Sequence, residues 1–144
     1  MNMANDPSIS FCIVSFNSQE LLKECLSSLL ENSPQISSEV IVVDNHSTDG
    51  SVEMIQNDFP DVILDILNSS ISYTQAMNRA MKRAKGRFLV QLNPDTLIKP
   101  GVWDALIGFM NGHQKVGICT PKILNRDGTL QKQCRRSSAG PWDT

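Results

Sequence analysis

Four short apolar runs alternate with segments whose apolar residues recur at helical spacing, and this alternation constrains the fold more than any other feature. The runs cover residues 8–16, 39–44, 61–67 and 87–92 ("SISFCIVSF", "EVIVVD", "DVILDIL" and "RFLVQL"). Continuous apolar runs of this length are typical of strands that are buried on both faces. Strands alternating with helices predict an α/β fold, with a mostly parallel sheet covered by helices on both faces.

The segments between these runs predict the helices. Two apolar stripes indicate helices, one formed by Leu21, Leu22, Cys25, Leu26, Leu29 and Leu30 and the other by Ala76, Met77, Ala80, Met81 and Ala84. A further helix, between these two along the chain, should carry Val52 and Ile55. The motif "NSQE" predicts a capping box, with Asn17 as N-cap and Glu20 three residues later. Thr48 or Asp49 should cap the helix that carries Val52 and Ile55.

The last third of the chain predicts less regular structure. Residues 101–110 ("GVWDALIGFM") predict a helix, and residues 116–121 ("VGICTP") predict a short strand. Residues 122–134 resemble a C-terminal hairpin that turns at Asp127-Gly128. The sequence contains no linker or internal repeat, so we expect one domain over residues 1–144.

Composition excludes several classes of protein. A hydrophobic fraction of 40% and a formal charge of −2 indicate a globular chain and argue against a nucleic-acid partner. No apolar run approaches the roughly 20 residues of a transmembrane helix. The first residues, "MNMANDPSIS", lack a signal-peptide pattern, so a cytoplasmic location is expected. The four cysteines, with no C-x-x-C spacing, should be reduced thiols: Cys12, Cys25, Cys119 and Cys134.

Three polar clusters stand at the carboxyl ends of predicted strands. They are Ser15-Phe16-Asn17, Asp44-Asn45-His46-Ser47 and Asn93-Pro94-Asp95-Thr96. In parallel α/β sheets, ligands bind at the carboxyl ends of the strands. The three clusters, although distant in sequence, should therefore meet at one binding site.

Each cluster admits a functional and a purely structural interpretation. Asp44 could accept a hydrogen bond from a nucleobase N–H or a ribose hydroxyl, or the residues after it could simply cap a helix. Pro94 restricts Asn93 to extended conformations and so presents Asp95 in one direction. A carboxylate beside an amide oxygen suits a divalent cation that also binds phosphate, whereas the alternative is an Asx-type turn. The basic residues 132–136 ("KQCRR") are either a solvated surface or an anion site.

Nearly the whole chain resembles one enzyme family. The segments "SISFCIVSFNSQELLKECLSSLL", "EVIVVDNHSTDGSVEMI", "YTQAMNRAMKRAKGRFLVQLNPDTLIKPG" and "VGICTPKILNRDGTLQKQCRR", within residues 8–136, resemble nucleotide-sugar glycosyltransferases of family 2. The likeness is greatest to the rhamnosyltransferase-like branch. It implies a Rossmann-like GT-A sheet that binds a nucleotide sugar, and a role in polysaccharide biosynthesis.

The resemblance also assigns residues. It implies a metal-binding role for Asp95, with Mg²⁺ or Mn²⁺ as cofactor, and Asn93 stands where the family's D-x-D motif has its first aspartate. Ser70 and Ser72 stand where the family usually has Asn and Gly. The residues with an implied donor-binding role are Ser15, Phe16, Asn17, Asp44, Ser72, Asn78, Arg79 and Asn93.

The implied reaction is an inverting transfer of a sugar from a dTDP-, UDP- or GDP-sugar donor to a saccharide or lipid-linked acceptor. Family members usually continue well beyond this length to form the acceptor site and supply the general base. We therefore expect the chain to be the donor-binding part, without an acceptor domain and inactive alone. No catalytic base is identified in it. The full-length protein should be cytoplasmic or peripheral to the inner face of the membrane.

Three other functions fit the predicted fold class less well. A sugar-nucleotide pyrophosphorylase should carry a Gly-rich, Lys/Arg-bearing loop after the first strand, and "SFNSQEL" has none. A receiver domain phosphorylated on Asp44 needs an acidic pair after the first strand and a lysine after the late strand, and both are missing. A non-catalytic nucleotide-sugar-binding or protein-interaction domain derived from the family remains the alternative.

Overall fold

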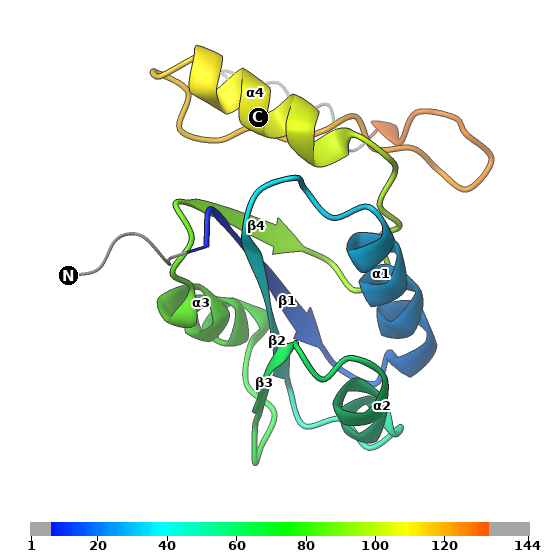
Figure 1. Ribbon diagram of the computed structural model, residues 1–144. Helices are drawn as coiled ribbons and strands as arrows, with labels where there is room; N and C mark the ends of the chain where they lie inside the picture. The colour runs from blue at the N-terminus through cyan, green and yellow to red at the C-terminus, as the bar shows by residue number, and fades with distance from the viewer. Residues whose placement is uncertain (1–6, 133–144) are drawn as a thin grey trace, which may run out of the picture. The chain divides into compact units, whose positions relative to one another are not determined.

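The computed structural model describes residues 7–132, and the chain divides into two compact units, residues 1–101 and 102–144. Figure 1 shows the helices and strands of both units. The first unit contains β1 (Ile9–Ser15), α1 (Gln19–Glu31), β2 (Ser38–Asp44), α2 (Ser51–Asp58), β3 (Ile63–Ile66), α3 (Tyr73–Arg83) and β4 (Phe88–Leu92). The second unit contains α4 (Val102–Gly112).

The four strands of the first unit form one parallel sheet in the order β3-β2-β1-β4. In this register Ser15 of β1 lies beside Asp44 of β2, and Ile13 of β1 lies beside Leu92 of β4. The carboxyl ends of the strands therefore lie at one edge of the sheet. The four strands predicted in this unit and the α/β class are confirmed, but β3 and β4 are not buried on both faces, since Ile63, Ile66 and Leu89 are exposed.

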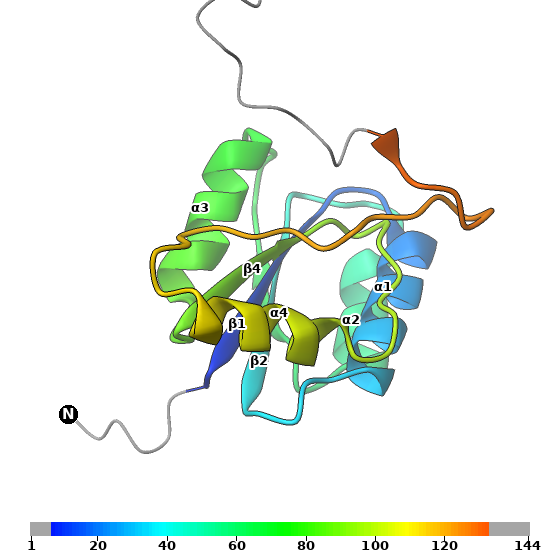
Figure 2. The same cartoon turned by 90° about the horizontal axis from the view of Figure 1, so that it is seen from above.

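Helices cover both faces of the sheet, as predicted. Side chains alternate between the faces, because successive strand residues point to opposite sides. On one face, Cys12 and Val43 belong to a buried cluster with Ala76 and Ala80 of α3. Figures 1 and 2 show α1 and α2 on the opposite side of the sheet from α3. The apolar stripe of α1 is buried there at Leu22, Cys25, Leu26 and Leu29.

The predicted helix caps are wrong for α1 and α2. The N-cap of α1 is Ser18, without a side-chain capping bond, because Asn17 adopts φ 46° and its Oδ1 accepts the Thr48 N–H at 2.8 Å. The N-cap of α2 is Gly50, at φ 86°, a left-handed conformation that favours glycine. Neither Asn17 nor Thr48 caps a helix. Asp49 precedes the N-cap of α2 by one residue and accepts the Ser51 N–H on Oδ1 at 3.1 Å.

The second unit confirms the predicted helix and turn but not the predicted strand. Residues 116–121 form no strand, since Ile118 is 91% exposed and no described segment pairs with them. The turn at Asp127-Gly128 is present. One antiparallel bridge joins Leu124 and Leu130, and Asn125 N–H donates to Thr129 O at 2.8 Å. Cys134 and most of the basic segment 132–136 lie outside the described residues.

The described cysteines are free thiols, as predicted. Cys12 and Cys25 are buried, and Cys119 is partly buried. None of the helices within residues 7–132 has both the length and the apolar character that crossing a bilayer requires.

Candidate functional site

Ser15 and Asp44 form the buried floor of the site, at the carboxyl ends of β1 and β2. Both are fully buried, and Asn45 N–H donates to Ser15 O at 2.8 Å. The Oδ2 atom of Asp44 accepts the Ser47 N–H at 2.9 Å, whereas Oδ1 has no hydrogen-bond partner within residues 7–132. A buried carboxylate oxygen without a partner is costly. A ligand N–H or O–H that reached Oδ1 would recover that free energy.

The loops after β1 and β2 are joined to each other by hydrogen bonds. Asn17 N–H donates to Ser47 Oγ at 3.0 Å, and Gln19 N–H donates to Asp49 Oδ2 at 2.9 Å. Burial opposes ionisation of Asp49, but the hydrogen bonds that it accepts from Ser51 and Gln19 outweigh burial and lower its pKa. The two loops therefore form one wall. Phe16, 53% exposed, lies in this wall.

The turn after β4 presents Asp95 to solvent. Thr96 N–H donates to Asn93 O at 3.3 Å, closing the turn around Pro94 and Asp95. Asn93 and Asp95 are both exposed, as their predicted roles require.

Two residues of α1, Cys25 and Ser28, and its C-cap Asn32 hold this turn and the segment after it, a role that was not predicted. Cys25 S–H donates to Asn93 O at 3.6 Å. Ile98 N–H donates to Ser28 Oγ at 3.0 Å, and Asn32 Nδ2 donates to Ile98 O at 3.3 Å. Ser28 and Asn32 are polar and four residues apart, so they lie on one side of α1. That spacing was the only signal in the sequence.

Asp95 could hold a divalent cation only together with a ligand. No cluster of three or more His, Cys, Asp or Glu side chains that could hold a metal exists within residues 7–132. A single carboxylate fits a cation such as Mg²⁺, which binds through one or two carboxylates and completes its shell with phosphate oxygens and water. The residues at this edge therefore fit a metal that arrives with a diphosphate.

Of the predicted residues on and before α3, Ser72 has a structural role. Ser72 is the N-cap of α3, where its Oγ accepts the Gln75 N–H at 3.3 Å, and Gln75 Oε1 accepts the Ser72 N–H at 3.1 Å. This is a complete capping box. Ser72 adopts φ −64°, so glycine is not required at this position.

Arg79 is bound to β3, one outer strand of the sheet, whereas Asn93 follows β4, the other outer strand. Its Nε and Nη2 atoms contact Asp65 of β3 at 2.5 and 2.9 Å, and Arg83 Nη1 contacts the same carboxylate at 3.0 Å. The Arg79 hydrogen bond lowers the pKa of Asp65. Asn78 is exposed on the same helix. No described contact brings Asn78 or Arg79 to Asp44 or Asp95.

Two asparagines hold the segment that leads into α3. The side chain of Asn45 donates from Nδ2 to Ile71 O and accepts the Ile71 N–H on Oδ1, both at 2.9 Å. Two residues later, Tyr73 O–H donates to Asn93 Oδ1 at 3.1 Å. Asn45 follows β2 and Asn93 follows β4, whereas β1 lies between them. Residues 71–73 are thus tied to the ends of both neighbours of β1.

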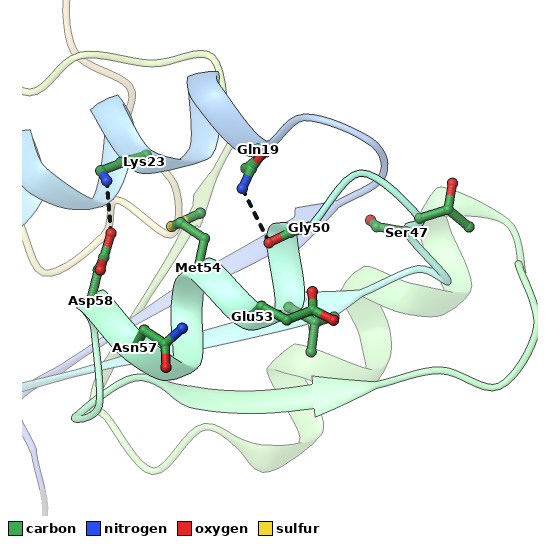
Figure 3. A pocket seen from close by; sticks show the side chains of 10 residues that line it. Gln19, Lys23, Ser47, Gly50, Glu53, Met54, Asn57 and Asp58 are labelled. Atoms are coloured by element: carbon green, nitrogen blue, oxygen red, sulfur yellow. Dashed lines mark hydrogen bonds and ion pairs between the residues drawn. The ribbon is translucent and has the colours of Figure 1, made fainter.

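A groove between α1 and α2 is a separate surface (Figure 3). Gln19 Nε2 donates to Gly50 O at 3.2 Å, and Lys23 Nζ contacts Asp58 Oδ2 at 2.7 Å, so bonds between the two helices cross the groove. Asp44, Asn93 and Asp95 do not line it. Its bonds hold α1 and α2 together.

Comparisons with known proteins identify the family of this chain. The family model described as "Glycosyl transferase family 2" matches residues 10–139. The chain is similar to the poly-beta-1,6-N-acetyl-D-glucosamine synthase of Staphylococcus epidermidis, with 28% identity over 132 residues, 86% of this chain and 31% of the synthase.

Two solved structures show a similar fold. The first is S. aureus TarS 1–349, with a TM-score of 0.65 and 23% identity over 79% of this chain and 38% of that chain. The second is the mannosyltransferase PcManGT from Pyrobaculum calidifontis, in complex with GDP-Man and Mn²⁺, with a TM-score of 0.58 and 27% identity over 72% of this chain and 31% of that chain. The chain spans between a fifth and a third of the length of the curated relatives that it matches.

Proposed function

Because this chain belongs to glycosyl transferase family 2, we propose that it binds the nucleotide-sugar donor of a glycosyl transfer reaction. The donor class is a nucleoside diphosphate sugar. Structures of TarS contain UDP and UDP-GlcNAc, and the PcManGT structure contains GDP-Man with Mn²⁺, which supports this class of ligand.

The observation that carries the proposal is the convergence of Ser15, Asp44 and Asp95 on one edge of the sheet. The buried Oδ1 atom of Asp44 lacks a partner within the described residues and suits a base N–H. The exposed carboxylate of Asp95 suits a cation held by the diphosphate. These two carboxylates, at the ends of β2 and β4, would contact different parts of the ligand, the base and the diphosphate.

In this proposal the loop residues contact the nucleoside and the turn after β4 contacts the diphosphate. Phe16 offers an exposed aromatic ring, and the wall around Asn17 bounds the base. Ser72, Asn78 and Arg79 would contribute indirectly, Ser72 by starting α3 and Arg79 through Asp65. A Mg²⁺ or Mn²⁺ ion, when bound, would neutralise charge on the leaving diphosphate.

The finer assignments are part of the same proposal. The reaction would be an inverting transfer to a saccharide or lipid-linked acceptor. The Asn93-Pro94-Asp95 turn, with an amide in the first position, supports placement in the rhamnosyltransferase-like branch.

Calorimetric titration tests the binding function. The chain is titrated with UDP-, GDP- and dTDP-sugars in the presence of Mn²⁺, and at least one should bind. Asp95→Ala should weaken that binding about tenfold or more, because a charge-assisted contact is lost. Asp44→Asn should also weaken it, because the substitution puts an NH₂ group where the base N–H would donate.

Asp61→Ala is the matched control, since Asp61 is exposed and lies before β3, at the opposite end of the strands. It should leave the affinity unchanged. Absence of binding by all three donors, or equal affinity for the wild type and Asp95→Ala, would contradict the proposal.

A further inference from the structure

A chain of three hydrogen-bonding side chains ends at Asn93. Gln91 Nε2 donates to Tyr73 Oη at 3.0 Å, and Tyr73 O–H donates to Asn93 Oδ1 at 3.1 Å. Gln91 is on β4 and Tyr73 is the first residue of α3. The phenol therefore links the start of α3 to the turn that carries Asp95.

The donor-to-acceptor direction of these hydrogen bonds decides which side-chain atom of Asn93 is left for a ligand. A tyrosine hydroxyl has one proton to donate, and here Gln91 supplies the proton that its oxygen accepts. The hydroxyl proton is directed to Asn93 Oδ1, so the amide oxygen is engaged. No described residue accepts from Asn93 Nδ2, and the side chain is exposed. Asn93 thus presents N–H groups at the sheet edge.

The main chain of Asn93 is held as well. Its carbonyl accepts the Cys25 S–H at 3.6 Å and the Thr96 N–H at 3.3 Å. With the backbone fixed, the bond from Tyr73 restrains the remaining side-chain rotation. Within the described residues the Tyr73 hydroxyl makes no hydrogen bond other than those with Asn93 and Gln91, so it is dedicated to this network.

We propose that Tyr73 is a positioning residue that orients the Asn93 amide so that its N–H groups donate to an oxygen of the bound nucleoside diphosphate. Asp95 is then the one carboxylate of this turn that faces the metal, and Asn93 is a hydrogen-bond donor in place of a second metal ligand. The inference rests on the proposed function for its ligand. Its geometric part concerns the unliganded protein.

NMR of the unliganded chain tests the geometric part. The side-chain NH₂ signals of Asn93 are assigned by their loss in Asn93→Ala. Since Nδ2 has no acceptor, these protons should exchange with water as fast as those of a free amide. Protection of these protons in the unliganded wild type would mean that Nδ2 donates to Tyr73, and would overturn the inference.

A double-mutant cycle tests the ligand part, with UDP and Mn²⁺ as the probe. Tyr73→Phe should weaken UDP binding about fivefold, the usual effect of one neutral hydrogen bond. In an Asn93→Ala background the same change should have no effect, because the oriented group is gone. Equal losses in both backgrounds would indicate a general structural role and would overturn the inference.

Thr74→Val is the matched control for this cycle. Thr74 is the next residue of α3 and is exposed, and its hydroxyl makes no hydrogen bond within the described residues, so UDP affinity should be unchanged. If the wild type binds UDP but Tyr73→Phe binds it equally well, only the inference about Tyr73 fails. If the wild type binds none of UDP-, GDP- and dTDP-sugars, the proposed function fails and the ligand part of the inference fails with it.

Discussion

The Asp49 carboxylate accepts the backbone N–H of Gln19, the first residue of α1, on Oδ2 at 2.9 Å. On Oδ1 it accepts the N–H and the hydroxyl of Ser51, the first residue of α2. One side chain therefore satisfies a donor at the start of each helix, where backbone N–H groups lack partners within the helix. The two helices begin at a common point because of this residue.

Asp49→Ala should lower the free energy of unfolding by about 2 kcal/mol, since it removes the hydrogen bonds that the first N–H groups of two helices donate to one carboxylate. Chemical denaturation measures the change. Asp61→Ala, at an exposed position without a side-chain hydrogen bond to any described residue, should change the free energy of unfolding by less than about 0.5 kcal/mol. A similar small effect for both substitutions would show that the shared cap contributes little.

Asp65 should make the fold sensitive to acid. Hydrogen bonds from Arg79 and Arg83 lower its pKa in the folded state. The unfolded state then binds more protons at low pH, so this contribution is complete above the ordinary aspartate pKa of about 3.9 and declines as the pH falls below it. Asp65→Asn should thus be less stable than wild type near pH 7, with a gap that narrows in thermal melts between pH 4 and pH 2.

Gly86 lies against the main chain of β1 and should not accept a larger residue. A Cβ at this position would be 2.5 Å from Ser10 N and 2.7 Å from Ile9 C, atoms that cannot move without disturbing the strand. Gly86→Ala should therefore destabilise the protein by about 1–3 kcal/mol, as overpacking does.

Gly108→Ala, in α4, gives the opposite expectation. A Cβ there meets nothing within 4 Å, and alanine is the better helix former by about 1 kcal/mol. Chemical denaturation of both variants shows whether each substitution lowers or raises the free energy of unfolding. Equal behaviour would show that the close approach at Gly86 is relaxed at no cost.

The cysteines should differ in reactivity. Burial raises the pKa of Cys12 to about 11 and that of Cys25 to about 11, so at pH 8 both remain protonated and enclosed. Cys119 is only partly buried. Iodoacetamide at pH 8 should modify Cys119 in the folded chain and reach Cys12 and Cys25 only after denaturation. Peptide mass spectrometry identifies the sites, and rapid labelling of Cys25 in the folded chain would contradict its placement.

Much of the fold could be predicted from local patterns. The apolar runs became β1 to β4, and the stripes of α1 and α3 became their buried faces, because burial follows residue spacing. Helix caps were less predictable. The capping box was predicted at Asn17 and Glu20 but occurs at Ser72 and Gln75, since the side chain of Asn17 is engaged by the neighbouring loop.

The site was predictable where it depends on strand ends. Asp44 is the last residue of β2 and Asp95 follows β4, so a parallel sheet brings them to the same end of the strands. The supporting residues were not predictable, because Tyr73, Cys25 and Ser28 act through contacts between segments up to 70 residues apart in sequence. A strand predicted over residues 116–121 failed because a strand requires a pairing partner as well as apolar residues.

The Asn45 bond to Ile71 bears on how this protein can evolve. Asn45 bonds the main-chain N–H and C=O of Ile71, and every residue except proline carries both groups. The segment before α3 can therefore drift in sequence while its path across the end of β1 is retained. Selection should act on Asn45 instead: conversion to aspartate would keep the acceptor for the Ile71 N–H but place a charged oxygen against the Ile71 carbonyl. The segment before α3 can therefore accept substitutions because Asn45, a side chain of the loop after β2, holds its main chain.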